Sequence, residues 1–196
     1  MNAKNYNALM ENEIAGFEKK HSLLLHCCCA PCSSACLERL KDFFDITVLY
    51  YNPNIEDEEY LRRKAELSRL IKETGWAKEM DCDREKDKFY SQIRGLEREK
   101  EGGKRCEVCF KLRLEKTAQT AETFGFDYFT TTLTVSPLKN AQLINEIGEN
   151  LSEGKSVKWL NSDFKKKDGY LKSIRLSEKY SLYRQDYCGC VYSINK

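Results

Sequence analysis

The sequence lacks any apolar run long enough to cross a membrane, and residues 1–21 contain no apolar stretch or cleavage site of the kind that a secretory signal needs. It also lacks internal repeats and low-complexity tracts. The formal net charge of +2 is too small to indicate a charged partner by itself. These absences predict a cytoplasmic protein that has no membrane partner.

Glycine is absent from residues 27–34, which follow the first predicted strand. In open α/β sheets, ligands bind where a strand meets the N-terminus of a helix, and nucleotide-binding proteins place glycines there so that backbone amides can bind phosphate. Thiols occupy this turn instead, at Cys28, Cys29 and Cys32, and Pro31 suits the first turn of a helix. We therefore predict a metal or redox site where a nucleotide pocket would otherwise lie.

Apolar strands and amphipathic helices alternate along most of the chain. This alternation predicts an α/β fold with a three-layer, Rossmann-like parallel sheet, in a single domain over residues 1–196. Residues 1–21 are expected to form an N-terminal docking helix, and residues 161–196 a basic, cysteine-containing C-terminal segment. The order of the strands cannot be read from the pattern. Strands are predicted at residues 22–28, 45–51, 76–80, 127–134 and 157–160.

The carboxyl ends of parallel strands meet along one edge of the sheet, and Asp81 follows the third predicted strand at that edge. Its carboxylate is a candidate metal ligand or proton donor. A helix N-cap explains the same residue equally well. Both interpretations therefore stay open for Asp81.

A second pair of thiols, Cys106 and Cys109, lies three residues apart at the start of a predicted helix. This spacing puts both sulfurs on one face, and the positive end of the helix favours the thiolate that metal ligation requires. In a reducing compartment, clustered cysteines favour metal binding or redox catalysis over disulfides. Together with Cys28 and Cys29 the pair can complete a four-thiolate site, which suits either zinc or a 4Fe–4S cluster.

The other cysteines differ in what they indicate. Cys188 and Cys190 are too close in sequence for a relaxed disulfide, so they suit a redox pair or two ligands of a second metal. Simple packing of the tail is the alternative. The role of Cys32 stays open. Cys27, Cys36 and His26 are predicted to pack in the interior, and Cys82, just past a strand end, is interpreted as a bystander.

The segment from residue 161 to residue 184 carries seven basic and three acidic side chains, a local excess of +4 in a nearly neutral chain. Tyrosines are interleaved with these charges. Basic groups bind phosphate and aromatic rings stack on unpaired bases, so the segment is a candidate RNA-binding surface. A solvated helix face accounts for the same pattern equally well. The residues that we single out as RNA contacts are Lys165, Lys166, Lys167 and Arg184.

Six blocks of sequence together are specific enough to indicate a family. They are HCCCAPC (26–32), YNPNI (51–55), GGKRCEVC (102–109), FTTTLT (129–134), DFKKKDG (163–169) and YRQDYCGC (183–190). With these blocks in this order, residues 23–193 resemble the cobalamin-independent epoxyqueuosine reductases, which finish the tRNA modification queuosine.

The resemblance implies a fold similar to the adenine nucleotide α-hydrolases (HUP or PP-loop proteins), with an iron–sulfur cluster in place of ATP. It implies that Cys188 and Cys190 are a redox-active pair or hold an additional mononuclear iron. Asp81, a candidate from its position after a strand, is a possible third ligand of that iron. The same three residues are the candidates for catalysis. The implied ligands of a 4Fe–4S cluster are Cys28, Cys29, Cys106 and Cys109.

The activity implied by the resemblance is the two-electron reduction of the epoxide of epoxyqueuosine in the anticodon loop of tRNA. This reaction yields queuosine and water and takes its electrons from an unidentified donor. The main alternative is a zinc-stabilised RNA-binding module without redox activity. An ATP-using tRNA thiolation enzyme of similar fold needs a glycine-rich phosphate loop, and the absence of glycine from residues 27–34 argues against it.

Overall fold

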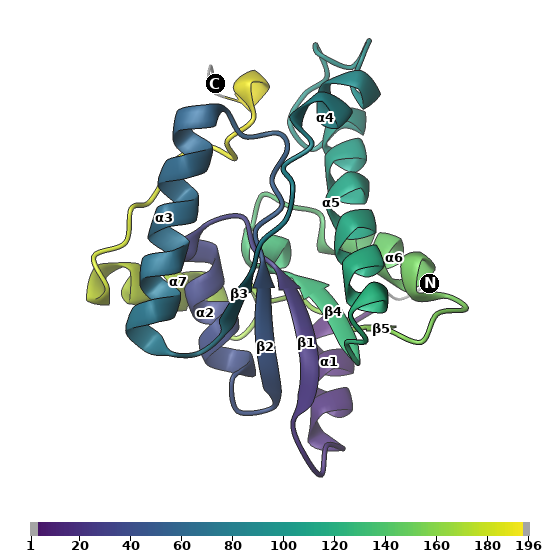
Figure 1. The fold of residues 1–196 in the computed structure, drawn as a ribbon, viewed down its shortest axis with the longest axis vertical. Coiled ribbons are helices and arrows are strands. Elements are labelled where there is room, and N and C mark those ends of the chain that lie inside the picture. Colours follow the sequence, from purple (N-terminus) through teal and green to yellow (C-terminus); the bar gives the residue numbers. More distant parts are fainter. Residues whose placement is uncertain (1–3, 194–196) are drawn as a thin grey trace.

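The computed structural model describes residues 4–193 of the chain. Residues 1–3 and 194–196, the outer ends of the two predicted terminal segments, lie outside the described residues. One sheet contains β1 (His21–His26), β2 (Phe44–Leu49), β3 (Lys78–Met80), β4 (Tyr128–Thr131) and β5 (Lys158–Trp159). The strand order is β3-β2-β1-β4-β5, and every neighbouring pair is parallel (Figure 1). The predicted α/β parallel sheet is confirmed.

Helices cover both faces of this sheet and complete three layers (Figure 1). One apolar core joins the sheet to α1 (Tyr6–Ala15), α2 (Ala30–Leu40) and α3 (Asp57–Thr74). The opposite core joins it to α4 (Lys86–Gln92), α5 (Lys104–Thr123) and α6 (Ala141–Ser152). The last helix, α7 (Gly169–Lys179), packs against α2.

The central strand β1 is apolar on both faces because both faces are covered. Successive side chains of a strand point to opposite sides, so Leu23 and Leu25 enter the core beside α2, and Leu24 enters the core beside α5. The turn that follows β1 therefore lies between helices from both layers. This is the position at which open α/β sheets bind ligands.

The fourth strand is shorter than predicted. β4 ends at Thr131, and a 3-10 turn, η1, takes Thr132–Val135. The Thr131 hydroxyl accepts a hydrogen bond from the Leu133 amide at 3.2 Å and lies 2.7 Å from Nδ1 of His26. A hydroxyl that satisfies a nearby amide offers the backbone an alternative to the sheet. The prediction of a strand over residues 127–134 was wrong in its second half for this reason.

None of the helices formed by residues 4–193 is both long enough and apolar enough to span a membrane.

Candidate metal centre

Three thiols lie together where β1 ends and α2 begins. The Sγ atoms of Cys28, Cys29 and Cys32 lie within 4.8 Å of one another, a group that can hold a metal ion. Cys29 is the N-cap of α2 with an extended backbone, and Pro31 lies in the first turn. Cys32 follows one turn later on the same side of the helix, so its sulfur joins the other two.

One of these three thiols, Cys28, favours the ionised form. Hydrogen bonds from Cys29 and Cys32 hold the pKa of Cys28 well below its ordinary value. The same interaction with Cys28 raises the pKa of Cys29 to about 12 and that of Cys32 well above its ordinary value. Metal ligation requires thiolates, so a metal that binds this group displaces the remaining protons.

The thiol group opens into a cavity of about 750 Å³. Cysteines from three distant parts of the chain line this one space, so the fold gathers thiols that are far apart in sequence. Those that line it are Cys28, Cys32, Cys106, Cys109, Cys188 and Cys190.

Cys106 and Cys109 reach the cavity from the first two turns of α5, which begins two residues before Cys106, the predicted start. The preceding loop turns at Gly102, whose φ of +87° favours glycine. The Gly102 amide donates a hydrogen bond to the Cys106 sulfur at 3.2 Å. Burial raises the pKa of Cys109. The loop and the helix start thus present both sulfurs to the cavity, one of them with a donor already directed at it.

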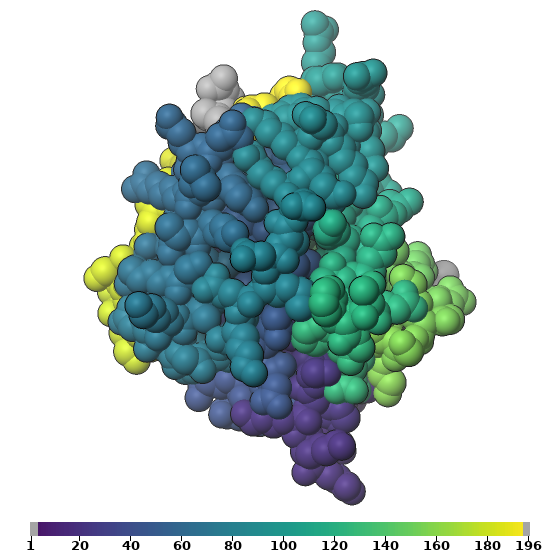
Figure 2. Space-filling model, viewed as in Figure 1, coloured from purple at the N-terminus to yellow at the C-terminus, as the bar shows by residue number. Residues whose placement is uncertain are grey.

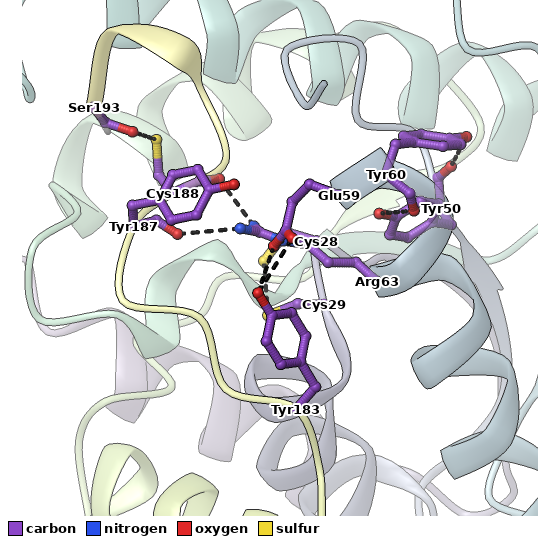
Figure 3. Close-up of polar contacts among 10 residues, drawn as sticks. All are labelled: Cys28, Cys29, Tyr50, Glu59, Tyr60, Arg63, Tyr183, Tyr187, Cys188 and Ser193. Carbon is purple, nitrogen blue, oxygen red and sulfur yellow. Dashed lines mark hydrogen bonds and ion pairs between the residues drawn. The ribbon is translucent and has the colours of Figure 1, made fainter. Parts of the chain in front are cut away.

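The turn that carries Cys188 and Cys190 is held by a buried arginine of α3. Arg63 is 1% exposed, and its Nε forms an ion pair with Glu59 at 2.5 Å. Its Nη1 donates to the Cys188 carbonyl at 3.1 Å and its Nη2 to the Tyr187 carbonyl at 3.3 Å. Figure 3 shows the guanidinium between the Glu59 carboxylate and this stretch of backbone. The contacts fix the backbone that positions Cys188.

The turn itself requires glycine. Gly189 has a φ of +96°, and a Cβ there would lie 2.9 Å from both Nη1 of Arg63 and Cγ1 of Ile55. Cys190 next to it forms an isolated antiparallel bridge with Ile55. The turn therefore packs directly against the arginine that binds its carbonyls.

Further side chains of α3 hold the chain just before this turn. Arg69 donates to the Tyr180 carbonyl at 2.8 Å, and Glu66 accepts from the Tyr183 amide at 2.9 Å. The Arg62 guanidinium stacks 3.4 Å from the centre of the Tyr183 ring. In the space-filling view, the C-terminal residues are visible along the left edge, beside the blue surface of α3 (Figure 2). The segment from residue 180 to residue 190 is thus docked on α3 by these polar contacts, together with Leu182, which is buried in the core that includes α3.

Cys188 and Cys190 differ in their protonation. A hydrogen bond from Cys190 lowers the pKa of Cys188 to about 5, and Ser193, 3.1 Å away, acts in the same direction. The interaction with Cys188 raises the pKa of Cys190. The pair therefore presents one thiolate and one thiol, which suits either thiol redox chemistry or metal ligation.

A family model described as "Epoxyqueuosine reductase QueH" matches residues 23–196. The chain belongs to this family. It is similar to the epoxyqueuosine reductase QueH of Streptococcus pyogenes serotype M1, with 46% identity over 198 residues, 96% of this chain and 78% of the relative. The enzyme of the same name from Staphylococcus epidermidis is 42% identical over 203 residues, 98% of this chain and 85% of the relative. That from Thermotoga maritima is 35% identical over 178 residues, 88% of this chain and 90% of the relative.

Asp81 does not join the thiols of this QueH-family chain. Its side chain is 92% exposed, and its carboxylate forms an ion pair with Lys64 at 2.9 Å. It is not among the residues that line the cavity. β3 is an edge strand of the sheet, so the residue that follows it lies outside the central crevice. The structure gives no support for Asp81 as a metal ligand or proton donor.

The four basic residues predicted to contact RNA separate into two groups. Arg184 lines the cavity, and its guanidinium lies 6.0 Å from the centre of the Tyr170 ring, which lines the cavity too. Lys165 and Lys167 form ion pairs with acidic neighbours at 2.7 and 2.6 Å, and Lys166 is exposed. None of these three lysines is a lining residue. Only Arg184 is therefore close to the thiols.

The residues predicted to have no part in the site are buried to different degrees. Cys27 and Cys36 are fully buried in the core that contains α2, and burial raises the pKa of both well above the ordinary value. Cys82 is partly exposed, and burial raises its pKa to about 11. The ring of His26 contacts Thr131 and the Tyr51 carbonyl, and burial lowers its pKa to about 4.

Among the cations of the site that were not predicted are Arg63, Arg113 and Lys139. All three line the cavity with the thiols. For Arg113 a signal was present, because it follows Cys109 by four residues and so shares a face of α5 with it. Arg63 and Lys139 carry no comparable pattern, since each is placed by a contact between distant segments.

Proposed function

We propose that this protein reduces epoxyqueuosine in tRNA to queuosine, with electrons passed through a 4Fe–4S cluster bound by Cys28, Cys29, Cys106 and Cys109. One observation carries the proposal. In a chain of the QueH family, a buried thiol group and the two sulfurs of a helix start adjoin the same cavity. The names of the relatives support the reaction and the thiols support the metal.

The donor set fits an iron–sulfur cluster. Thiolates are the ligands of such clusters, and Cys28 already favours the thiolate form. Cys32 lies within the same 4.8 Å group, so it is an alternative ligand to Cys29, which does not line the cavity. Several cationic side chains line the cavity, among them Arg113 and Lys139, and they suit a group of net negative charge.

The reaction requires two electrons and two protons. Both carbon–oxygen bonds of the epoxide break, a carbon–carbon double bond forms, and the oxygen leaves as water. A 4Fe–4S cluster supplies electrons one at a time, from an external reductant of low potential. A dithiol, or a further iron held by Cys188 and Cys190, would help to complete the electron pair.

The departing oxygen needs a proton donor. His26 is unsuitable because burial lowers its pKa to about 4 and both ring nitrogens have partners. Tyr187 lines the cavity, and burial raises the pKa of its phenol, so it holds its proton at neutral pH. We propose Tyr187 as the residue that holds a proton close to the departing oxygen.

Arg184 and Tyr170 give the cavity features suited to RNA. The guanidinium can bind a phosphate, and the ring, which is 38% exposed, can stack on an unpaired base. A cavity of about 750 Å³ is in the usual range for a nucleoside-sized ligand. Lys165, Lys166 and Lys167 would act further out, on the tRNA backbone. A tRNA substrate also implies action in the cytoplasm.

The deciding experiment is anaerobic purification followed by iron and sulfide analysis and an activity assay. With dithionite as the reductant, the protein should convert epoxyqueuosine in tRNA to queuosine, measured by mass spectrometry of the digested nucleosides. Cys106→Ala should lose both cluster and activity, whereas Cys82→Ser, whose thiol does not line the cavity, should retain both. A colourless zinc protein without activity would favour the alternative of an RNA-binding module.

A further inference from the structure

Arg113 is a buried cation for which residues 4–193 provide no acidic partner. Its side chain is 3% exposed and lines the thiol cavity from α5. One Nη2 hydrogen bond goes to the Asn54 side-chain oxygen, and Nε has no hydrogen-bond partner. Among residues 4–193, no carboxylate lies within ion-pair distance of it. A guanidinium cannot lose its charge, so this charge is buried as it stands.

The other two most deeply buried arginines are compensated. Arg63 has the Glu59 carboxylate and two carbonyls. Arg105, also 3% exposed, donates through Nη1 to three backbone carbonyls, at 2.6 to 3.1 Å. Arg113 has a single neutral amide. An uncompensated buried charge typically costs several kcal/mol, so the difference calls for a physical reason.

The groups that act on Arg113 electrostatically are mainly thiols. They are foremost Cys109, Cys28 and Cys188, each of which lines the same cavity. Lys139 is in the same position, since Cys28, Cys32 and Cys188 are the foremost groups that favour its charged form. Both cations therefore face the sulfurs that would have to bind a metal.

We propose that Arg113, assisted by Lys139, is the countercharge for a metal–thiolate group in this cavity. The inference rests on the proposed function for the identity of that group, a 4Fe–4S cluster. Four thiolates outweigh the charge of such a core, so the bound group is a net anion, and charge near a cluster helps to set its reduction potential. The buried charge of Arg113 therefore destabilises the metal-free protein and stabilises the protein once the anionic group is bound.

The proposal predicts opposite effects of one substitution in the two forms of the full-length protein. Arg113→Met removes the charge and keeps much of the volume. In metal-free protein, denaturant unfolding should show Arg113→Met to be as stable as the wild type or more stable. In cluster-loaded protein, the variant should release iron to a chelator at least tenfold faster. The equilibrium constant for one-electron reduction of its cluster should also fall about tenfold. This corresponds to a reduction potential that is more negative by about 59 mV.

Two variants separate charge from shape. Arg113→Lys keeps the charge and should retain most of the cluster stability and potential. Arg39→Met removes an arginine that pairs with Glu11 at 2.9 Å and does not line the cavity. It should destabilise both forms alike and leave the potential unchanged. If Arg113→Met behaves like Arg39→Met, the proposal is overturned.

A folding defect in Arg113→Met would still leave a test. Lys139 is only partly buried, so Lys139→Met should fold and should shift the potential and the rate of iron release in the same direction. An unchanged potential in Lys139→Met would then reject the proposal. Failure of the proposed function is distinguishable, because the wild type would contain no iron. In that case cobalt(II) is the probe, and Arg113→Met should weaken its thiolate absorption band.

Discussion

The Cys28–Cys32 turn and the Cys188–Cys190 turn adjoin one cavity, but different forces hold them there. The first turn joins β1 to α2, and the apolar cores of both sheet faces enclose it. The second is tied to α3 by a buried arginine, two acidic side chains and a glycine, and its segment adds Leu182 and Cys190 to the apolar cores. Apolar enclosure resists local opening, whereas a polar attachment can open while the sheet remains intact. We infer that the first turn belongs to the rigid frame and the second to a separately stable segment.

The largest expected effect concerns metal content. Cys28→Ala should leave the protein with less than about a tenth of its iron, because it removes the thiol that favours ionisation from the enclosed turn. Cys188→Ala should keep the cluster iron and lose activity. Iron and sulfide analysis after anaerobic purification measures the difference. Equal iron loss in both variants would contradict the proposed division between the two turns.

The next effect is on global stability. Glu59→Ala removes the only carboxylate paired with Arg63 among the described residues and should cost about 3–5 kcal/mol of unfolding free energy. Glu73→Ala, on the same helix, breaks the ion pair with Arg69, whose side chain is 43% exposed, and should cost less than about 1 kcal/mol. Urea unfolding provides both values. Similar values for the two variants would show that burial of Arg63 does not govern the docking.

A smaller effect on stability separates the strain of a positive φ from a steric contact of the new Cβ. Gly189→Ala and Gly125→Ala both place a side chain at positive φ, +96° and +70°. Only at Gly189 does the new Cβ meet other atoms, those of Arg63 and Ile55. We expect Gly189→Ala to be less stable than Gly125→Ala by about 1 kcal/mol or more. Identical unfolding midpoints would show that the turn does not need its close approach to Arg63.

The smallest expected effect is on the local stability of residues 180–190. Tyr183→Phe removes a hydroxyl that lies 3.2 Å from Glu59 and should cost about 1 kcal/mol. Amide hydrogen exchange should become faster in residues 180–190 and stay unchanged in α6, which lies on the other side of the sheet. Faster exchange throughout the chain would mean that the segment opens only with the whole fold.

Much of the α/β fold could be predicted from the local sequence pattern, because the alternation of apolar strands and helices indicates directly which residues are buried. The turn after β1 is the clearest case, since its thiols, Pro31 and the missing glycines are adjacent in sequence. β4 was predicted too long because the Thr131 hydroxyl ends the strand through side-chain contacts that a propensity pattern does not contain.

The site was predictable where its residues lie next to strand or helix ends and not where distant segments meet. Asp81 follows a strand like the others, but β3 is an edge strand, and only the strand order reveals this. The charge excess of residues 161–184 did not show which base reaches the cavity, because acidic neighbours pair with Lys165 and Lys167. Arg63 acts on carbonyls more than a hundred residues away in sequence.

The position of β1 between β2 and β4 also sets the time at which the cavity can form. β4 pairs with β1 across a sequence separation of 105 residues, as the contact of His26 with Thr131 illustrates. Contacts of such long range close slowly, and the ribosome delivers Cys28 well before Cys106. A nascent chain thus presents its first thiols without their partners. Metal loading is therefore expected to follow release and folding of the complete sheet.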